Sequence, residues 1–368
     1  MPTLAPPDKV LVTGANGYVG IWVVKLLLDR GYQVRGAVRS REKGEALAKI
    51  VEQKAPARAK DFEYVVVEDL TADHAYDDAV KGVAGAVHVA SPLIGTAQHP
   101  DLVIKPAVEG TLGLLRSALA HGQGMKRIVI TSSVRAVIRG EFGCTYTEED
   151  WADDAVQEVE EKGSAAQGMS MYGASKVLAE RAAWNFHAEH KNEVGWDLVT
   201  IGLGWVFGGL RTPAEPELTA PSLSPQPTVE DPAEPKDLPS TAGLFYNVMS
   251  GNPMFDPFYA AGHNYIDSRD GAEGHVKALE VEAAGGERLI VSSHWCHWQD
   301  WRNKAGELGY FPKLDKGDPE RCASVQSRPC SSEKAKRVLG IEFKTLPETL
   351  KDTLDYYRQR GWLAEYEA

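Results

Sequence analysis

The chain has 368 residues, of which 43% are hydrophobic and 25% charged, and its formal net charge at pH 7 is −12. This length and apolar content suffice for one large α/β domain or for two domains. The acidic balance, which no basic stripe offsets, argues against nucleic acid and anionic membranes as partners.

The N-terminal segment, residues 1–9, lacks the apolar core with positive flanks that a signal peptide needs. No later apolar run is long enough to span a bilayer. We therefore expect a cytoplasmic protein that makes no membrane contact.

The four cysteines follow neither a disulfide framework nor the paired spacing of a zinc site, so we expect free thiols. They are Cys144, Cys296, Cys322 and Cys330. The run 294–297 places two histidines around Cys296, but neighbours on a strand point to opposite faces and rarely chelate one ion. The sequence therefore predicts no metal site.

The first predicted element is a buried parallel strand, Lys9–Thr13, which is short, apolar and β-branched. A glycine turn follows, and then an apolar helix over Ile21–Leu28. Gly14 and Gly17 permit a tight turn and the close approach of the backbone to a pyrophosphate at the helix N-terminus. Gly20 lets the helix pack closely on the strand. This order of elements predicts a dinucleotide site.

Strands and helices alternate through the rest of the first half, which indicates a doubly wound parallel sheet of the Rossmann type. The other predicted strands are Gln33–Val38, Phe62–Val67, Ala86–Ala90, Arg127–Ser133 and Asp197–Ile201. The other predicted helices are Glu42–Lys54, Leu102–Ala120 and a stretch from near Tyr172 to Glu189. No internal repeat is present.

A tyrosine–lysine pair and the polar end of one predicted strand indicate proton transfer chemistry. Tyr172 and Lys176 lie four residues apart near the start of a predicted helix, so they share one face. An ammonium beside a phenol favours the phenolate, which makes the tyrosine a usable general acid near neutral pH. Thr131–Ser133 end a strand, where a parallel sheet presents its site, and a serine there would hold a substrate carbonyl oxygen. The alternative is an ordinary exposed helix face, because Tyr-x-x-x-Lys also arises by chance.

In this combination the chain resembles the extended short-chain dehydrogenase/reductase family, in the branch with dihydroflavonol reductases, cinnamoyl-CoA reductases and fungal methylglyoxal and aldehyde or ketone reductases. The segments that carry the resemblance are Thr13–Gly20, Val38–Ser40, His88–Pro92, Pro106–Thr111, Thr131–Ser133, Tyr172 with Lys176, and Tyr265–Asp270. They span nearly the whole chain. The resemblance implies that Ser133, the second serine of its pair, is catalytic together with Tyr172 and Lys176.

The resemblance also implies which residues contact the cofactor, including a pair after the third strand that flanks the adenine. These residues are Gly14, Asn16, Gly17, Tyr18, Val19, Arg39, Lys43, Asp69, Leu70, Ala90, Ser91, Tyr172, Lys176, Leu203 and Gly204.

The end of the second strand favours NADP over NAD. An NAD site usually places an acidic residue there, whereas a 2′-phosphate needs cations. Arg39 can pair a phosphate with two parallel bonds and stack on adenine, and Lys43 adds a point charge. A solvated basic turn is the alternative, but no acidic residue takes the place of Arg39.

One segment departs from the family pattern. Relatives usually carry Asn-Pro-Gly or a similar run after the sixth strand, with the proline beside the nicotinamide, whereas this chain reads Gly202-Leu203-Gly204-Trp205. Because glycine is conformationally permissive, we expect a flexible loop here, which would affect how the nicotinamide is positioned. Trp205 and Phe207 would add an aromatic wall to the pocket.

Residues 211–239 are rich in proline and small or acidic residues, which excludes a helix or a central strand. We expect a surface insertion, with an interdomain linker or a lid as alternatives. The predicted division is an NADP-binding domain, residues 1–205, and a smaller substrate-binding lobe, residues 206–368. An amphipathic helix over Leu346–Tyr357 would end the lobe.

The candidate pocket residues are largely apolar or aromatic, which indicates a hydrophobic or aryl carbonyl compound rather than a sugar. They are Leu93, Ile94, Arg135, Trp205, Phe245, Tyr246 and Met249. Each of them fits core packing equally well.

The resemblance therefore implies an NADPH-dependent aldehyde or ketone reductase, a monomer or homodimer, which in reverse is an alcohol dehydrogenase. A nucleotide-sugar epimerase or dehydratase is an alternative, and it would need a diphosphate-binding surface in the C-terminal lobe. A non-catalytic NADP-binding sensor is another, although such proteins typically lack the tyrosine and lysine.

Overall fold

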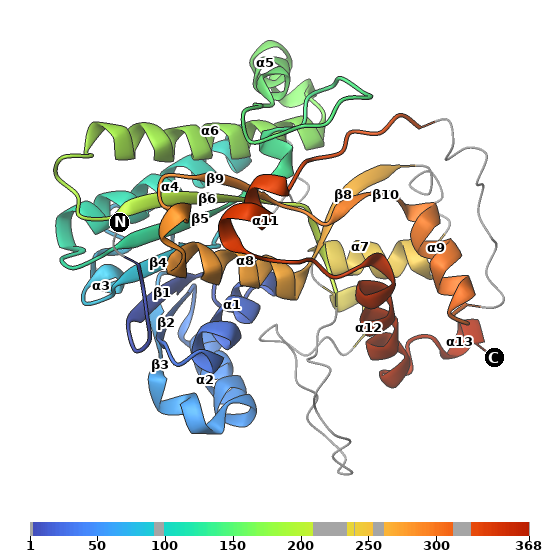
Figure 1. Ribbon diagram of the computed structural model, residues 1–368, viewed down its shortest axis with the longest axis horizontal. Helices are drawn as coiled ribbons and strands as arrows, with labels where there is room; N and C mark the ends of the chain where they lie inside the picture. Colours follow the sequence, from blue (N-terminus) through green and yellow to red (C-terminus); the bar gives the residue numbers. More distant parts are fainter. Residues whose placement is uncertain are drawn as a thin grey trace.

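The central element of the computed structural model is a seven-stranded parallel sheet with the strand order β3-β2-β1-β4-β5-β6-β9 (Figure 1). The structure describes residues 3–91, 99–208, 234–238, 240–252, 261–311 and 325–367. The strands are β1 Lys9–Thr13, β2 Gln33–Val38, β3 Phe62–Val66, β4 Gly85–His88, β5 Arg127–Ser133, β6 Asp197–Leu203 and β9 Arg288–Val291. The predicted α/β fold with a doubly wound parallel sheet is thus confirmed.

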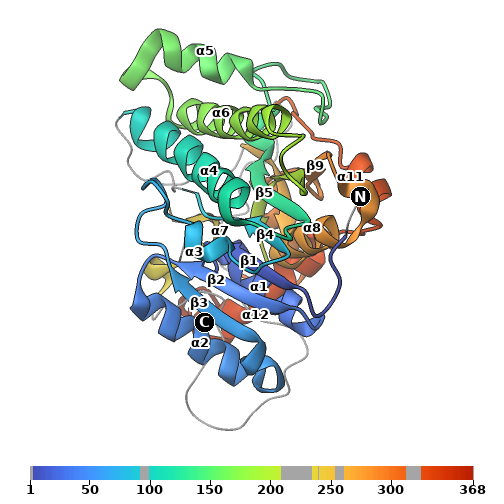
Figure 2. The same cartoon turned by 90° about the vertical axis from the view of Figure 1, so that its left-hand side faces the viewer.

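Helices cover both faces of this sheet, as Figure 2 shows from the side. α4 (Asp101–His121) and α6 (Gly168–Glu189) pack together on one face, and α1 (Tyr18–Asp29) and α8 (Ser268–Glu280) on the other. Successive strand residues point to opposite faces, so Val10 and Val12 join the core under α1 and α8. Leu11 joins the core under α4 and α6. The remaining helices around the sheet are α2 Arg41–Lys54, α3 Asp77–Val80, α5 Asp153–Lys162 and α11 Glu333–Leu339.

A three-stranded sheet, in the order β10-β8-β7, lies beside the first. Its strands are β7 Trp205–Phe207, β8 Gly262–Asp267 and β10 His294–His297, and the helices near it are α7 Ser240–Met249, α9 Trp298–Glu307, α12 Leu346–Gln359 and α13 Ala364–Glu367. α12 confirms the predicted terminal helix, and a capping box of Thr345 and Glu348 starts it. An aromatic core that includes Phe207, Trp298 and Trp301 holds this part together.

The chain passes between the two sheets more than once. β6 of the large sheet leads directly into β7 of the small one, and β9 returns to the large sheet after β8. The predicted division into residues 1–205 and 206–368 remains a prediction, and part of the second range, α8 and β9, packs on the first sheet.

The expected flexible loop after the sixth strand is wrong. β6 continues to Leu203, and Trp205 already belongs to β7, which pairs with β8. Gly204 donates its N–H to the Val291 carbonyl at 3.2 Å. A Cβ at Gly204 would stand 2.9 Å from the carbonyl carbon of Tyr265. The glycine therefore serves the close approach of two strands rather than flexibility.

The structure describes only part of the proline-rich segment and three of the four cysteines. Most of the proline-rich segment, residues 211–233 and 239, lies outside the described residues, and a 3₁₀ turn spans Pro235–Asp237. Cys144, Cys296 and Cys330 carry free thiols, whereas Cys322 is not among the described residues. Within the described ranges, no helix is long and apolar enough to cross a membrane, and no cluster of acidic, histidine or cysteine side chains is arranged to hold a metal ion.

Candidate active site

The carboxyl ends of neighbouring strands bring the predicted site segments to one edge of the large sheet. In the parallel register, Thr13 pairs with Ala37 on one side and with His88 on the other. Ser133 pairs with Leu203 further along. The glycine turn, the basic turn, the loop after β4 and the serine pair therefore meet at this edge, where parallel sheets bind ligands.

The glycine turn has the shape that a dinucleotide site requires. Gly14 has φ +63°, and a Cβ there would stand 3.0 Å from the backbone of Ala90. A Cβ at Gly20 would stand 2.1 Å from the carbonyl oxygen of Gly14. No side chain caps α1 at Gly17, and no acidic residue occupies its first turn. The first N–H groups and the positive helix end are thus available to a phosphate, together with the partly buried Asn16 and Val19.

The Tyr18 side chain has a structural partner within the protein. Its hydroxyl donates a hydrogen bond to the Gly208 carbonyl at 2.9 Å, which ties the start of α1 to the residue after β7. Burial, aided by the charge of Asp267, raises the pKa of Tyr18. Only the backbone of Tyr18 therefore remains for the predicted contact with a cofactor.

The basic turn after β2 presents two cations, Arg39 and Lys43. Ser40 caps α2 by accepting the Lys43 N–H at 3.4 Å, so the turn is ordered. Arg39 is exposed and Lys43 partly buried, and neither side chain makes a hydrogen bond or ion pair with any residue that the structure describes. The Ala15 N–H donates to the Ala37 carbonyl at 3.3 Å, which joins this turn to the glycine turn.

The predicted adenine-flanking pair follows β3. Oδ1 of Asp69 accepts hydrogen bonds from the hydroxyl and the N–H of Thr71, which together lower the pKa of Asp69. The Leu70 side chain packs on α4, where a Cβ at Gly110 would stand 2.1 Å from Cδ1 of Leu70.

Thr13 and His88 hold the loop after β4, a contact that the sequence analysis missed. Thr13 Oγ1 lies 2.9 Å from His88 Nδ1 and accepts the N–H of Ala90 at 3.1 Å. Burial, with a smaller contribution from the charge of Lys176, lowers the pKa of His88 to about 3, so the imidazole is neutral. The two residues are 75 positions apart, and only their strand-end positions hinted at the contact.

Lys176 and Tyr172 lie together on α6, as predicted from their spacing. The Lys176 ammonium is 5.5 Å from the centroid of the Tyr172 ring. It donates a hydrogen bond of 2.9 Å to Ser91 Oγ, although only 7% of Lys176 is exposed. α6 is thereby joined to the loop after β4, and the two predicted catalytic residues face the cofactor edge of the sheet.

The two serines at the end of β5 have different partners. Ser132 donates a hydrogen bond of 2.6 Å to Glu180, so its hydroxyl proton is engaged. Ser133 Oγ accepts the N–H of Arg135 at 3.2 Å, which leaves the Ser133 hydroxyl proton free to be donated. This difference supports Ser133 as the serine for a substrate oxygen. Glu180 was missed, although its position four residues after Lys176 placed it on the same helix face.

Leu203 and Gly204, two other predicted cofactor contacts, have no side chain that could reach a cofactor. The Leu203 side chain is buried in the core, 3.6 Å from the Cβ position of Gly271 on α8. Gly204 is packed against β8, as described above. Either residue would meet a cofactor through main-chain atoms alone.

The predicted pocket residues are mostly core residues. Phe245 and Met249 are buried in the aromatic core of the small sheet, and Tyr246 packs on Tyr357 and Trp362. Phe245 and Met249 are therefore wrong as pocket walls, because both are fully buried in the packing of the small lobe, whereas Tyr246 is partly buried and stays a prediction. Trp205 is only partly buried. Leu93 and Ile94 lie outside the described residues.

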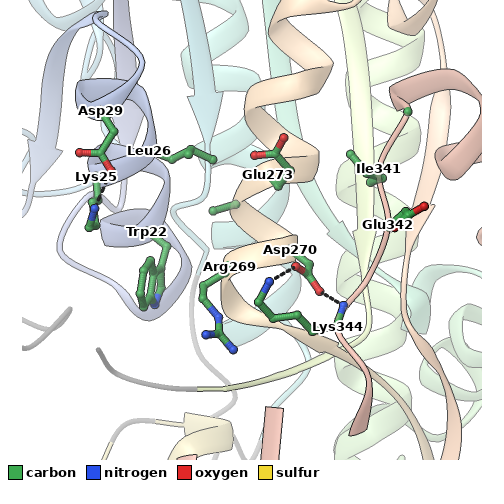
Figure 3. A pocket seen from close by; sticks show the side chains of 12 residues that line it. Trp22, Lys25, Leu26, Asp29, Arg269, Asp270, Glu273, Ile341, Glu342 and Lys344 are labelled. Carbon is green, nitrogen blue, oxygen red and sulfur yellow. Dashed lines mark hydrogen bonds and ion pairs between the residues drawn. The ribbon is translucent and has the colours of Figure 1, made fainter. Parts of the chain in front are cut away.

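A cavity of about 410 Å³ between α1, α8 and residues 340–344 contains none of the predicted site residues (Figure 3). Most of its charged groups are neutralised within the protein. Lys25 pairs with Asp29, and the Lys344 N–H donates to Asp270 at 2.6 Å. Burial raises the pKa of Asp270 to about 6, which this hydrogen bond opposes. We assign no role in binding to this cavity.

Comparisons with known proteins agree with the site. Residues 10–220 match the model of the NAD dependent epimerase/dehydratase family. An NADPH-dependent methylglyoxal reductase of Saccharomyces cerevisiae is 30% identical over 94% of this chain and 96% of its own, and a cinnamoyl-CoA reductase of Medicago truncatula is 31% identical over 96% of both. A Candida albicans reductase crystallised in complex with NADPH superimposes with a TM-score of 0.80 at 27% identity, over 96% of this chain and 99% of the other. The chain therefore belongs to the NAD dependent epimerase/dehydratase family, the extended short-chain dehydrogenases/reductases.

Proposed function

We propose that the protein is an NADPH-dependent carbonyl reductase that acts on an aldehyde or ketone. The observation that carries the proposal is the position of Lys176, whose ammonium lies beside the Tyr172 ring and bonds to Ser91 at the cofactor edge of the sheet. The NADPH-dependent methylglyoxal reductase and the NADPH complex among the similar proteins support the same cofactor and reaction.

The residues that would hold NADPH offer a separate partner for each part of the cofactor. The turn of Gly14 and Gly17 and the uncapped N-terminus of α1 would receive the pyrophosphate. Arg39 and Lys43 would receive the 2′-phosphate, because their side chains have no partner among the described residues. Asp69 and Leu70 would flank the adenine, and Ala90 and Ser91 the nicotinamide half. When bound, NADPH supplies the hydride for the carbonyl carbon.

Three side chains would carry the proton chemistry. Tyr172 donates its phenolic proton to the carbonyl oxygen, and Ser133 donates a hydrogen bond to the same oxygen. The Lys176 ammonium stabilises the phenolate that Tyr172 becomes. Ser91 and the neutral His88 behind it keep Lys176 in place, because the Thr13 contact fixes the loop that carries Ser91.

Trp205 bears on the substrate class, and the net charge bears on the partners of the protein. Trp205 would give the pocket an aromatic wall, which suits a hydrophobic or aryl carbonyl compound. The acidic net charge supports the absence of nucleic acid as a partner, and we further propose a cytoplasmic enzyme that is a monomer or homodimer.

Steady-state assays of NADPH oxidation with a panel of aldehydes and ketones test the proposal. We expect turnover with several aryl or aliphatic carbonyl compounds and much weaker turnover with NADH. Turnover of nucleotide sugars without net NADPH consumption would instead support an epimerase or dehydratase. NADPH binding without turnover of any compound in the panel would indicate a non-catalytic sensor.

A further inference from the structure

Arg135 lies at the candidate active site, two residues after Ser133. It belongs to the 3₁₀ turn Val134–Ala136 that follows β5, and its N–H donates to Ser133 Oγ at 3.2 Å. A Cβ at Gly173, the neighbour of Tyr172, would stand 3.3 Å from the Arg135 carbonyl oxygen and 3.9 Å from Nη2 of Arg135. The guanidinium of Arg135 therefore lies against α6 beside the proposed catalytic tyrosine.

The guanidinium of Arg135 has no acceptor within the described part of the chain. Its Nε is fully buried without a hydrogen-bond partner, and its two terminal amino groups are not fully buried and make no hydrogen bond or ion pair there. Other arginines near the site are paired. Arg288 binds Glu180 at 2.7 Å, and Arg139 binds Asp150 at 3.2 Å.

The charges around Arg135 compensate its own charge only in part. Burial lowers the pKa of Arg135, and the nearby charge of Arg328 lowers it further. The charges of Asp154 and Tyr172 oppose that shift. The Asp154 carboxylate already accepts the N–H groups of Gly140 at 2.6 Å and Ala155 at 3.0 Å.

Arg328 is itself poorly satisfied. Its Nη1 donates a long bond of 3.4 Å to the Arg139 carbonyl, its Nε is buried without a partner, and its guanidinium lies over the Phe142 ring. Arg135 thus has one nearby carboxylate, Asp154, which is already engaged, and a second poorly satisfied guanidinium, that of Arg328, as a neighbour. Leaving a partly buried charge unpaired is costly, and the planar fork of arginine matches a carboxylate with two parallel hydrogen bonds.

We infer that Arg135 determines substrate specificity by pairing with a carboxylate, so that the substrate is an oxo acid, a carbonyl compound that carries a carboxylate. This inference rests on the reductase function proposed above and adds the substrate class. The reaction adds a hydride from NADPH to the carbonyl carbon and a proton to its oxygen, which gives a hydroxy acid and NADP⁺. The carboxylate is unchanged, so Arg135 acts by binding and orienting the substrate.

Matched acids and esters test the inference. Benzoylformate and its methyl ester are one aryl ketone with and without a negative charge. In 4-formylbenzoate and its methyl ester the carbonyl group is an aldehyde, and it lies further from the carboxylate or ester group. We expect kcat/KM to be about 10- to 100-fold higher for the acid in at least one pair, because a charge-assisted hydrogen bond contributes about 1.5–3 kcal/mol. Arg135→Gln should remove that preference mainly through KM of the acid, so that kcat/KM falls much further for the acid than for its ester.

Arg139→Gln is the matched control, because Arg139 lies four residues further along and is already ion-paired. It should keep the preference for the acid. Equal or better turnover of the ester in both pairs, or an acid preference that survives Arg135→Gln, would overturn the inference. If the wild-type enzyme turned over neither the acids nor the esters, that result would contradict the proposed function instead.

Inhibition of the wild-type enzyme keeps the inference testable even where Arg135→Gln fails to fold. Benzoate should compete with a neutral aldehyde substrate at least about tenfold more strongly than benzamide, which has the same shape without the charge. Equal inhibition by benzamide would overturn the inference. Inhibition by inorganic phosphate as strong as that by benzoate would overturn the assignment to a carboxylate.

Discussion

Ser132 Oγ donates a hydrogen bond of 2.6 Å to Oε2 of Glu180, one helical turn beyond Lys176. The other carboxylate oxygen of Glu180 accepts from Thr200 at 2.8 Å and from Arg288 at 2.7 Å. One buried carboxylate therefore joins β5, β6 and β9 to the helix that carries both proposed catalytic residues. The helix that carries Lys176 is thus held by a network in which neither Tyr172 nor Ser133 takes part.

Glu180→Gln should destabilise the protein by about 3 kcal/mol, because it leaves the Arg288 charge buried without its carboxylate. Urea unfolding measures this loss as a lower transition midpoint. Glu189→Gln is the control, since Glu189 is an exposed carboxylate on the same helix, and it should change the free energy of unfolding by less than about 0.5 kcal/mol. Equal stabilities of the two variants would show that the Glu180 network does not support α6.

Gly20→Ala should weaken NADPH binding and lower stability by about 1–3 kcal/mol, because the new methyl group would stand 2.1 Å from the Gly14 carbonyl oxygen. Gly306→Ala on α9 is the matched control, since no described residue beyond its chain neighbours and its own helix backbone lies within 4 Å of its Cβ position. That change should be neutral or stabilising by up to about 1 kcal/mol. Calorimetry with and without NADPH checks both, and unchanged NADPH affinity in Gly20→Ala would refute the close packing of α1 on the turn.

The buried histidines should make stability fall in mild acid. The folded-state pKa of His88 is about 3 and that of His275 about 4, both lowered by burial, whereas an unfolded histidine titrates near pH 6.5. Above about pH 6.5 both states are neutral, and below it only the unfolded state gains the proton. Each histidine then lowers the free energy of unfolding by about 1.4 kcal/mol per pH unit.

The variant His88→Gln isolates one of these contributions. Urea unfolding between about pH 7 and pH 5 should show a slope shallower than that of the wild type by up to about 1.4 kcal/mol per pH unit. Parallel slopes for the two proteins would mean that His88 is not held neutral in the folded state.

The strands were predictable from short apolar runs. Lys9–Thr13, Gln33–Val38 and Arg127–Ser133 have the same bounds in the sequence analysis and in the structure. Lys9–Thr13 and Arg127–Ser133 are rich in β-branched residues, and Gln33–Val38 has two valines, so local preference and burial agree. The face shared by Tyr172 and Lys176 was predictable for the same reason, because a helical period is a local property.

Contacts between distant residues were not predictable in this way. The role of Gly204 depends on how closely β8 approaches, and local reasoning about glycine predicted flexibility instead. Phe245 and Met249 suit a pocket wall and a core equally well by residue type. Only the packing of α7 on the small sheet decides between the two.

Arg39→Asp tests the choice of cofactor. Arg39 can meet a 2′-phosphate only when the nucleotide has one, so the variant should bind NADPH about 10- to 100-fold more weakly and bind NADH about as well as the wild type or better. Fluorescence titration of both nucleotides measures this difference. Equal affinity of the wild type for NADH and NADPH, or an equal loss of both in Arg39→Asp, would show that Arg39 does not select the cofactor.

The most direct test of the proposed reductase is Tyr172→Phe, which removes one hydroxyl and leaves the ring beside Lys176. The measurement is kcat/KM for NADPH-dependent reduction of the best carbonyl substrate, together with NADPH affinity by titration. We expect a loss of about 10²–10⁴-fold in kcat/KM with NADPH affinity within about threefold of wild type, because a positioned general acid is absent while the cofactor contacts remain. Turnover close to that of the wild type in Tyr172→Phe would contradict the assignment of Tyr172 as the proton donor.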